Sequence, residues 1–141
     1  MNTKSIVAGL LAGLTLFLLG WLIYGILLAD LFSDMGGTAT GVAKTDEEMM
    51  SSIHWLVIGQ MALGLLLSYI FAKWASISTF SGGAKAGAVI GAFVAIGWDF
   101  TMLGTSNVTS LSSTLLDVVL MIIQMALAGA VAGWWLGRGD A

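Results

Sequence analysis

Long apolar blocks, separated by shorter polar segments, run along the whole chain. Four blocks have about 20 apolar residues or more, the length of helix that crosses a bilayer, and they lie near 5–31, 53–74, 83–104 and 115–137. Runs of Leu, Ala, Gly, Ile and Met suit helices, and the alternation of a membrane barrel is absent from the sequence. The pattern predicts an all-α fold, an integral membrane four-helix bundle formed by one domain over residues 1–141. The first block is longer than the core of a cleavable signal, so we expect it to remain in the mature protein.

The composition agrees with a membrane protein and excludes several function classes. Apolar residues make up 58% of the chain and charged residues 9%, whereas an ordinary soluble domain has about 25% charged residues. Five Lys and Arg cannot form a basic patch, which argues against nucleic-acid binding. The absence of Cys excludes thiolate metal sites, and a single His excludes bis-His haem and the usual zinc sites. We therefore expect no cofactor and no metal.

The few cations predict the orientation of the helices. Lys4, Lys73, Lys85 and Arg138 fall on the side of the predicted helices that carries both termini, and only Lys44 falls on the other side. Because cytoplasmic loops carry the excess of Lys and Arg, we expect cytoplasmic N- and C-termini.

The long loop at 32–52 contains a helix start. Thr45 is followed three residues later by Glu48, a capping-box pattern, so the second helix is expected to begin there. Thr114 and Asp117 repeat the pattern before the fourth helix, which makes Asp117 a predicted capping residue near the positive helix end.

Short matches relate the two halves of the chain. One set joins the first and third helices and another joins the second and fourth, as expected for two duplicated helical hairpins. Chance similarity in a chain rich in Leu, Ala and Gly is the alternative, and the sequence leaves both open. The matches are Ala8-Gly9, Gly13 and Gly20-Trp21 with Ala86-Gly87, Gly91 and Gly97-Trp98, and Gln60-Met-Ala-Leu63 with Gln124-Met-Ala-Leu127.

Glycines recur at intervals of four residues in three of the helices. This G-x-x-x-G spacing places them on one helix face, where backbones approach each other closely. We expect them to pack helices in the cytoplasmic half and not to bind a ligand. They are Gly9 and Gly13, then Gly83, Gly87 and Gly91, then Gly129, Gly133 and Gly137.

Polar residues lie in the outer half of the predicted helices. Gln60 and Gln124 would face each other near the bundle axis under the repeat, each amide supplying the partner that the other needs in hydrocarbon. Such interhelical bonding is the favoured interpretation over a conduction path. His54 lies at the outer interface, where a solvated imidazole is favoured over a role in pH sensing or metal binding.

Asp99 has no ready structural explanation. It lies about one and a half turns inside the outer end of the third helix, and that end is a helix C-terminus, whose dipole does not favour an anion. A carboxylate inside the membrane is a functional-site hypothesis by default. Gln124, His54 and Tyr24 are its predicted partners.

The chain resembles a known family in several segments. They are the run from Phe17 to Leu27, the acidic segment before the second helix, the glycine-rich start of the third, and Leu116-Asp117 with Gly129, Gly133 and Trp134 in the fourth. In these the chain is similar to the small four-helix bacterial membrane proteins of domain-of-unknown-function family 1761. The resemblance implies the same architecture, and it implies no activity and no site residues.

Two functions from different classes follow. The favoured one is a non-enzymatic accessory or oligomerising protein of the bacterial inner membrane, whose glycine faces pack against each other or a membrane-protein partner. The alternative is a small transporter or channel for a proton, cation or small solute. Its outward-facing vestibule would contain Asp99, Gln60, Gln124, Asp117 and His54. An intramembrane enzyme ranks third, because no nucleophile stands beside a base.

Overall fold

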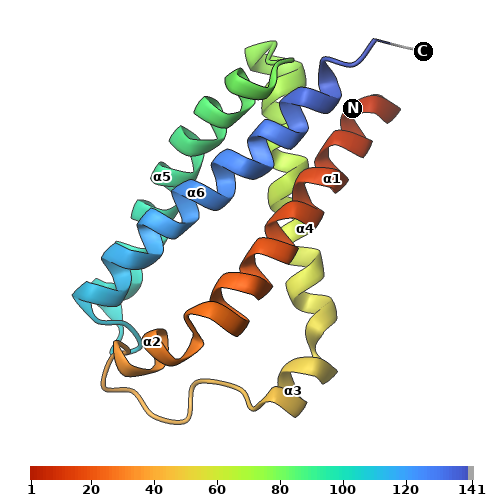
Figure 1. Cartoon of the computed structure of the whole chain (residues 1–141). Helices are drawn as coiled ribbons and strands as arrows, with labels where there is room; N and C mark the ends of the chain where they lie inside the picture. Colours follow the sequence, from red (N-terminus) through yellow and green to blue (C-terminus); the bar gives the residue numbers. More distant parts are fainter. Residues whose placement is uncertain (140–141) are drawn as a thin grey trace.

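The computed structural model describes residues 1–139, and within them the chain forms helices and no strands. Both termini lie at one end of the molecule, while α2 and α3 lie at the other (Figure 1). The elements are α1 (Thr3–Gly20), the π-helical segment η1 (Trp21–Leu27), α2 (Ala29–Asp34), α3 (Asp46–Ser51), α4 (Ile53–Ile70), the π-helical segment η2 (Phe71–Ala75), α5 (Phe80–Thr105) and α6 (Leu111–Leu136).

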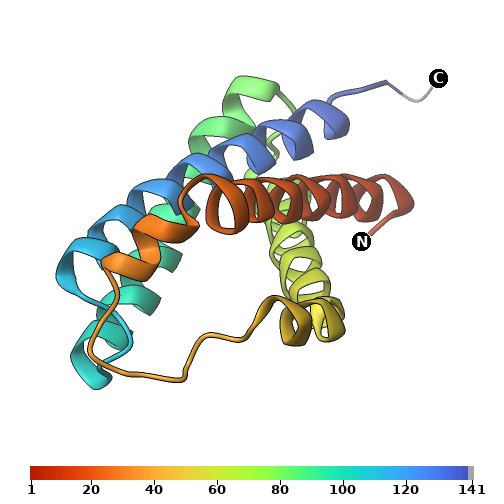
Figure 2. The ribbon, with the colours of Figure 1, turned by 60° about the horizontal axis from the view of Figure 1, so that its bottom comes forward.

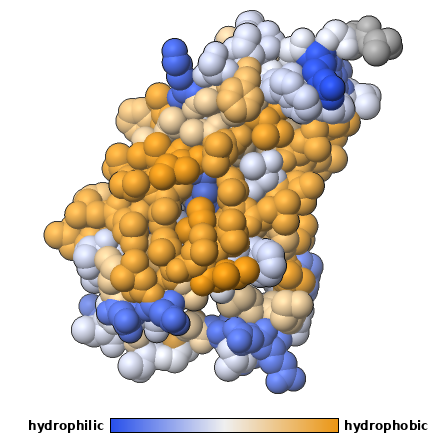
Figure 3. Space-filling view, in the orientation of Figure 1, coloured by the Kyte–Doolittle hydropathy of each residue, from blue (hydrophilic) through white to orange (hydrophobic). Residues whose placement is uncertain are grey.

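Four of the helical segments are long and apolar enough to cross a membrane, which confirms the predicted fold class. They are Thr3–Leu27, Ile53–Ala75, Phe80–Thr105 and Leu111–Leu136. In each span, at most 33% of the most apolar 18-residue stretch is buried inside the protein. Apolar residues accordingly cover the middle of the visible face, and hydrophilic residues lie at both ends (Figure 3). The chain is a multi-pass membrane protein whose helices face lipid.

The last two spans begin earlier than predicted because hydroxyl residues cap them. Thr79 precedes α5, and its Oγ1 accepts a hydrogen bond from the Gly82 amide at 3.0 Å. Ser110 precedes α6 and forms a capping box with Ser113. Each cap satisfies an amide that the first turn leaves without an intrahelical partner, so the helices extend into the loops.

The helices associate as two hairpins. α4 packs along α1, and α5 packs along α6, while contact between α1 and α6 joins the two pairs. α4 and α5 are therefore the peripheral helices (Figures 1 and 2). Figure 2 shows that α4 diverges from α6 toward α3, and that the loop between α2 and α3 crosses this opening.

Glycines bring α1 and α4 into backbone contact. A Cβ at Gly13 would lie 2.8 Å from the Met61 Cα, and one at Gly9 would lie 2.8 Å from the Leu65 Cα. A Cβ at Gly64 would overlap the backbone of Gly13. No side chain fits between these helices, as the predicted packing role of Gly9 and Gly13 requires.

Glycines also bring α5 and α6 into close contact. A Cβ at Gly91 would lie 2.5 Å from the Met125 Cβ, and one at Gly87 would lie 3.2 Å from the Gly129 Cα. In the alignment of the repeat, Gly91 and Met125 correspond to Gly13 and Met61. The two matched sets of residues therefore meet in equivalent pairs.

All the glycines predicted to pack helices contact other segments of this chain. Gly83 faces Gly129 and Gly133 across the hairpin, and a Cβ at Gly137 would overlap the Ser78 carbonyl. The glycine contacts lie toward the end with the termini. The closely packed half of the molecule is therefore the half with the termini, as the sequence predicted.

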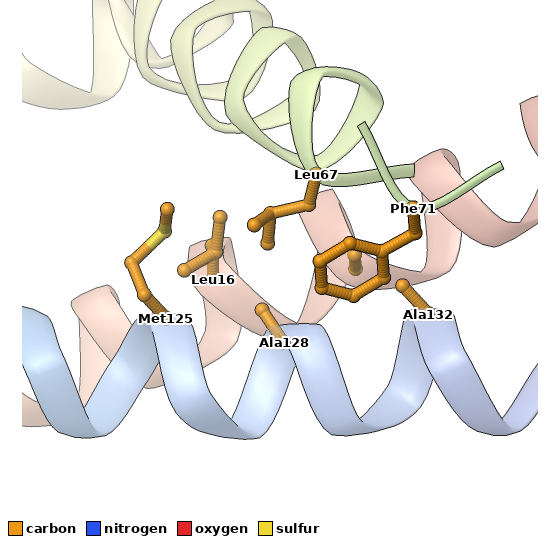
Figure 4. Packing of buried hydrophobic residues seen from close by; sticks show 7 residues of the cluster. Leu16, Leu67, Phe71, Met125, Ala128 and Ala132 are labelled. Carbon is orange, nitrogen blue, oxygen red and sulfur yellow. The ribbon is translucent and has the colours of Figure 1, made fainter. Parts of the chain in front are cut away.

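A hydrophobic cluster joins the hairpins near this packed half (Figure 4). Leu16 of α1, Leu67 of α4 and Phe71 of η2 meet α6 there, and each is at most 1% exposed. The small side chains of α6 let these larger residues approach its backbone. The whole cluster is Ala12, Leu16, Leu67, Phe71, Met125, Ala128 and Ala132.

The long first loop has the predicted capping box, but the helix that follows is short. The Thr45 amide donates to Glu48 Oε2 at 2.9 Å, and the Glu48 amide donates to Thr45 Oγ1 at 3.3 Å. These bonds with Thr45 lower the pKa of the exposed Glu48 carboxyl, because they favour its charged form. Ser52, at φ −112° and ψ 14°, separates α3 from α4. The prediction of one continuous helix from Thr45 was therefore wrong.

Backbone hydrogen bonds tie the first loop to the loop between α5 and α6. The Gly37 amide donates to the Val108 carbonyl at 3.0 Å, and the Ala39 amide donates to the Asn107 carbonyl at 2.9 Å. A Cβ at Gly37 would overlap the Asn107 backbone. Glycine thus permits a contact that holds α2 against the start of α6.

Gly87→Ala tests the backbone contact in the α5–α6 hairpin. Its Cβ would overlap the Met125 carbonyl oxygen, so α5 and α6 must move apart. We expect a loss on the order of 1–3 kcal/mol in the free energy of unfolding, measured by circular dichroism in detergent. Gly97→Ala is the matched control, because a Cβ there meets nothing within 4 Å. Equal losses in both variants would contradict the packing role.

Candidate functional site

A cavity of about 260 Å³ with several polar residues in its lining lies at the end of the molecule opposite to the termini. Its walls come from η1, α2, α5, the following loop and the first two turns of α6 (Figure 1). The lining residues are Tyr24, Phe32, Asp99, Thr109, Ser113, Thr114 and Asp117.

The π-helical segment η1 carries Tyr24 into this cavity. The Leu28 amide donates to the Ile23 carbonyl at 2.8 Å, a hydrogen bond with the five-residue spacing of a π turn. Such turns interrupt α-helices most often at functional sites. The Tyr24 ring packs against Phe32 of α2, with the ring centroids 5.2 Å apart. The two aromatic rings form one wall of the cavity.

A hydrogen-bond chain links α1 to α6 at the base of the cavity. Gln124 Nε2 donates to the Tyr24 hydroxyl oxygen at 3.3 Å, and that hydroxyl donates to Asp117 Oδ1 at 2.5 Å. Gln124 is only 4% exposed. Its amide gains the partner that a buried polar group needs in the apolar interior.

Asp117 is not the capping residue that the sequence predicted. α6 begins at Leu111, and Ser110 with Ser113 provides its capping box. Asp117 therefore stands in the second turn, beyond the amides that a cap would satisfy. Its carboxylate is free to turn toward Tyr24.

Asp99 of α5 lines the same cavity and has an unsatisfied oxygen. Its Oδ2 is buried and has no hydrogen-bond partner. The Asp99 carboxyl interacts with Asp117, which lines the same cavity, through charge and through a side-chain hydrogen bond. The Tyr24 hydroxyl, a predicted partner of Asp99, instead donates to Asp117. Two acidic side chains thus share one site.

Two threonine hydroxyls share this lack of partners. Thr109 Oγ1 and Thr114 Oγ1 are both buried without a hydrogen bond, and Thr114 is only 1% exposed. The sequence pattern predicts Thr114 as a cap, and it assigns no role in a site to Thr109. The signal that could have indicated Thr114 is its position three residues before Asp117, which places both on one face of α6.

Gln60 and His54 do not belong to this cavity. The backbone of Gln60 lies against Gly13 in the α1–α4 contact. Gln124 bonds to Tyr24, so the predicted Gln60–Gln124 pair is wrong. The His54 ring packs at a tilt against the Trp55 ring, with the ring centroids 4.8 Å apart. Within residues 1–139, no three His, Cys, Asp or Glu side chains are grouped so that they could hold a metal ion.

A loop contact holds two walls of the cavity together. Ser110 Oγ donates to the Met35 carbonyl, which fixes the end of α2 beside the start of α6. Phe32 therefore stays in the wall formed by α2, and Thr109 stays beside the N-terminus of α6. The site is held by the same loop contacts that join the two hairpins.

Tyr24→Phe tests the hydrogen-bond chain. The variant leaves the Gln124 amide and one Asp117 oxygen without a protein partner, so we expect a loss of about 1–3 kcal/mol in the free energy of unfolding. Tyr69→Phe is the control, because that ring packs edge-on against Trp74 and is 36% exposed. Chemical unfolding in detergent gives both values. An unchanged Tyr24→Phe protein would mean that the chain adds no stability.

Comparisons with known proteins add no further assignment. No family model, no curated protein and no solved structure matches the chain. The resemblance to family 1761 therefore stays a prediction, and the functional argument depends on the geometry of the cavity.

Proposed function

We propose that this protein is a small transporter or channel of the bacterial inner membrane, which binds a proton or small cation in its polar cavity. The observation that carries the proposal is the set of three buried oxygens without partners, from Asp99, Thr109 and Thr114, in one cavity. A buried polar group without a partner costs free energy. A ligand that binds these oxygens removes that cost.

The charges support a cation. Asp99 and Asp117 are both acidic, and among the described residues none of those that line the cavity is Lys or Arg. Two acidic groups in a site of low dielectric repel each other unless a proton or another cation lies between them. Acidic residues inside membrane spans mark ion and proton paths in many transporters.

The packing indicates which part would have to move. The cavity lies at the end with α2, and the cluster around Leu16, Leu67 and Phe71 lies between it and the termini. A bound cation would reach the opposite side only if this cluster opened. The site therefore lies on the α2 side of a closed region, which supports the vestibule hypothesis.

The interaction hypothesis has less support. It depended on glycine faces that were free to pack against a partner, and these faces are occupied within the chain. Assembly would have to use another surface. We also propose that the protein is not an enzyme, since Ser113 in the cavity stands beside Thr114 and Asp117 and not beside a histidine.

The charge distribution supports cytoplasmic termini. Lys4, Lys73, Lys85 and Arg138 all belong to elements at the end with the termini, whereas Asp46, Glu47 and Glu48 begin α3 at the opposite end. By the positive-inside rule, the cavity then faces the periplasm.

Asp99→Asn tests the transport proposal in proteoliposomes. We expect wild-type vesicles to conduct protons or a monovalent cation faster than protein-free vesicles, as reported by a trapped pH dye and by tracer uptake. The variant keeps the shape of the side chain and loses its charge, so flux should fall at least about tenfold. Asp30→Asn is the control, because Asp30 is exposed on α2. Wild-type vesicles without flux of either kind would overturn the proposal.

Reporter fusions at the C-terminus test the orientation. We expect a fused fluorescent protein to be active and a fused periplasmic phosphatase to be inactive, because the cation-rich end stays in the cytoplasm. A fusion in the loop between α2 and α3 should give the opposite pair of results. A periplasmic C-terminus would place the cavity on the cytoplasmic side and contradict the proposed direction.

A further inference from the structure

We infer that the ligand of the cavity is a small organic compound with a primary ammonium group. This inference depends on the cation site proposed above and specifies its ligand. It follows from the number of free acceptors, from the charge of the site and from the size and chemistry of its walls.

The free acceptors match the donors of a primary ammonium group. Asp99, Thr109 and Thr114 line the cavity, and their Oδ2, Oγ1 and Oγ1 atoms are buried without a hydrogen-bond partner. An –NH₃⁺ group has three N–H donors and no acceptor. One such group has a donor for each of these oxygens, and every bond that it donates is charge-assisted.

The rest of the polar lining is already engaged. Tyr24 donates to Asp117 and accepts from Gln124, and Ser113 belongs to the capping box of α6. These groups hold their positions and do not compete for the three acceptors. The carboxylate of Asp117 adds a second negative charge beside the ammonium group.

The walls indicate an organic ligand. A cavity of about 260 Å³ has room for much more than one bare ion or one water. The rings of Tyr24 and Phe32 form an apolar wall on which a short alkyl chain can pack, and aromatic faces also attract ammonium groups. A bare alkali-metal ion would leave this aromatic wall without a contact.

Ligand binding by the purified full-length protein tests the inference. The probe is ethylammonium chloride, with sodium chloride at equal ionic strength and the neutral 1-propanol as comparisons. We expect ethylammonium to raise the unfolding temperature in a saturable way, and isothermal titration to give a dissociation constant. Sodium and 1-propanol should have no comparable effect.

Thr114→Val separates binding from structure. The valine keeps the branched shape and removes a buried hydroxyl without a partner, so the ligand-free variant should be as stable as the wild type or more stable. Its affinity for ethylammonium should fall at least about fivefold, because one acceptor is lost. Thr114→Ser should restore binding. Thr101→Val is the control, because Thr101 is exposed and donates to its own helix at Gly97.

The outcomes distinguish this inference from the proposed function. Binding of sodium without ethylammonium would overturn the inference and leave the cation site in place. Equal binding of 1-propanol would mean that the cavity binds apolar groups without regard to charge, and it would overturn the inference. Undiminished binding of ethylammonium by Thr114→Val would show that the Thr114 hydroxyl is not an acceptor for the ligand, and it would also overturn the inference. Failure of every cation to bind or to cross proteoliposomes would overturn both.

Discussion

Direct contact between helix backbones within each hairpin is the constraint on which the rest of the structure depends. Lipid tails are as apolar as the side chains they surround, so helices in a bilayer associate through close packing. Gly13 against Gly64 in one hairpin and Gly87 against Gly129 in the other provide that packing. Both contacts lie toward the end with the termini, and α4 diverges from α6 toward the other end. The cavity lies at this other end, away from the closely packed half.

The polar groups lie at the end opposite to the termini, where η1, α2, α5 and α6 surround the cavity. α1 loses its regular winding at η1, and the wider π turn changes the direction in which Tyr24 points relative to the rest of the helix. Its hydroxyl then bridges Asp117 and Gln124 of α6. The contact between α1 and α6 is thus apolar where Leu16 lies and hydrogen-bonded where Tyr24 lies. The hydrogen bonds satisfy Gln124, whereas Asp99 Oδ2, Thr109 Oγ1 and Thr114 Oγ1 are buried without a partner.

The sequence predicted the spans and the glycine contacts, because hydropathy and spacing report burial and helix faces directly. It also singled out Asp99, which lines the cavity. It did not predict the hydrogen bond between Tyr24 and Asp117, since the sequence offers two successive capping patterns, from Ser110 and from Thr114, and only the backbone decides between them. The Gln60–Gln124 pair failed for another reason. Equivalent positions in two hairpins face each other only in a symmetric bundle, and here α1 packs on α6 while α4 and α5 remain peripheral. Periodicity within one helix cannot reveal which helices are neighbours.

The internal repeat and the cavity can be understood together through this asymmetry. The alignment that pairs Trp21 with Trp98 and Gln60 with Gln124 places Asp99 on Leu22 and Asp117 on Ile53. The two hairpins thus have glycines at their backbone contacts, and they differ in the residues that line the cavity. The α1–α4 hairpin packs with apolar residues at the positions that correspond to the two acids. Backbone packing therefore does not explain Asp99 and Asp117, which supports the proposal that they bind a ligand.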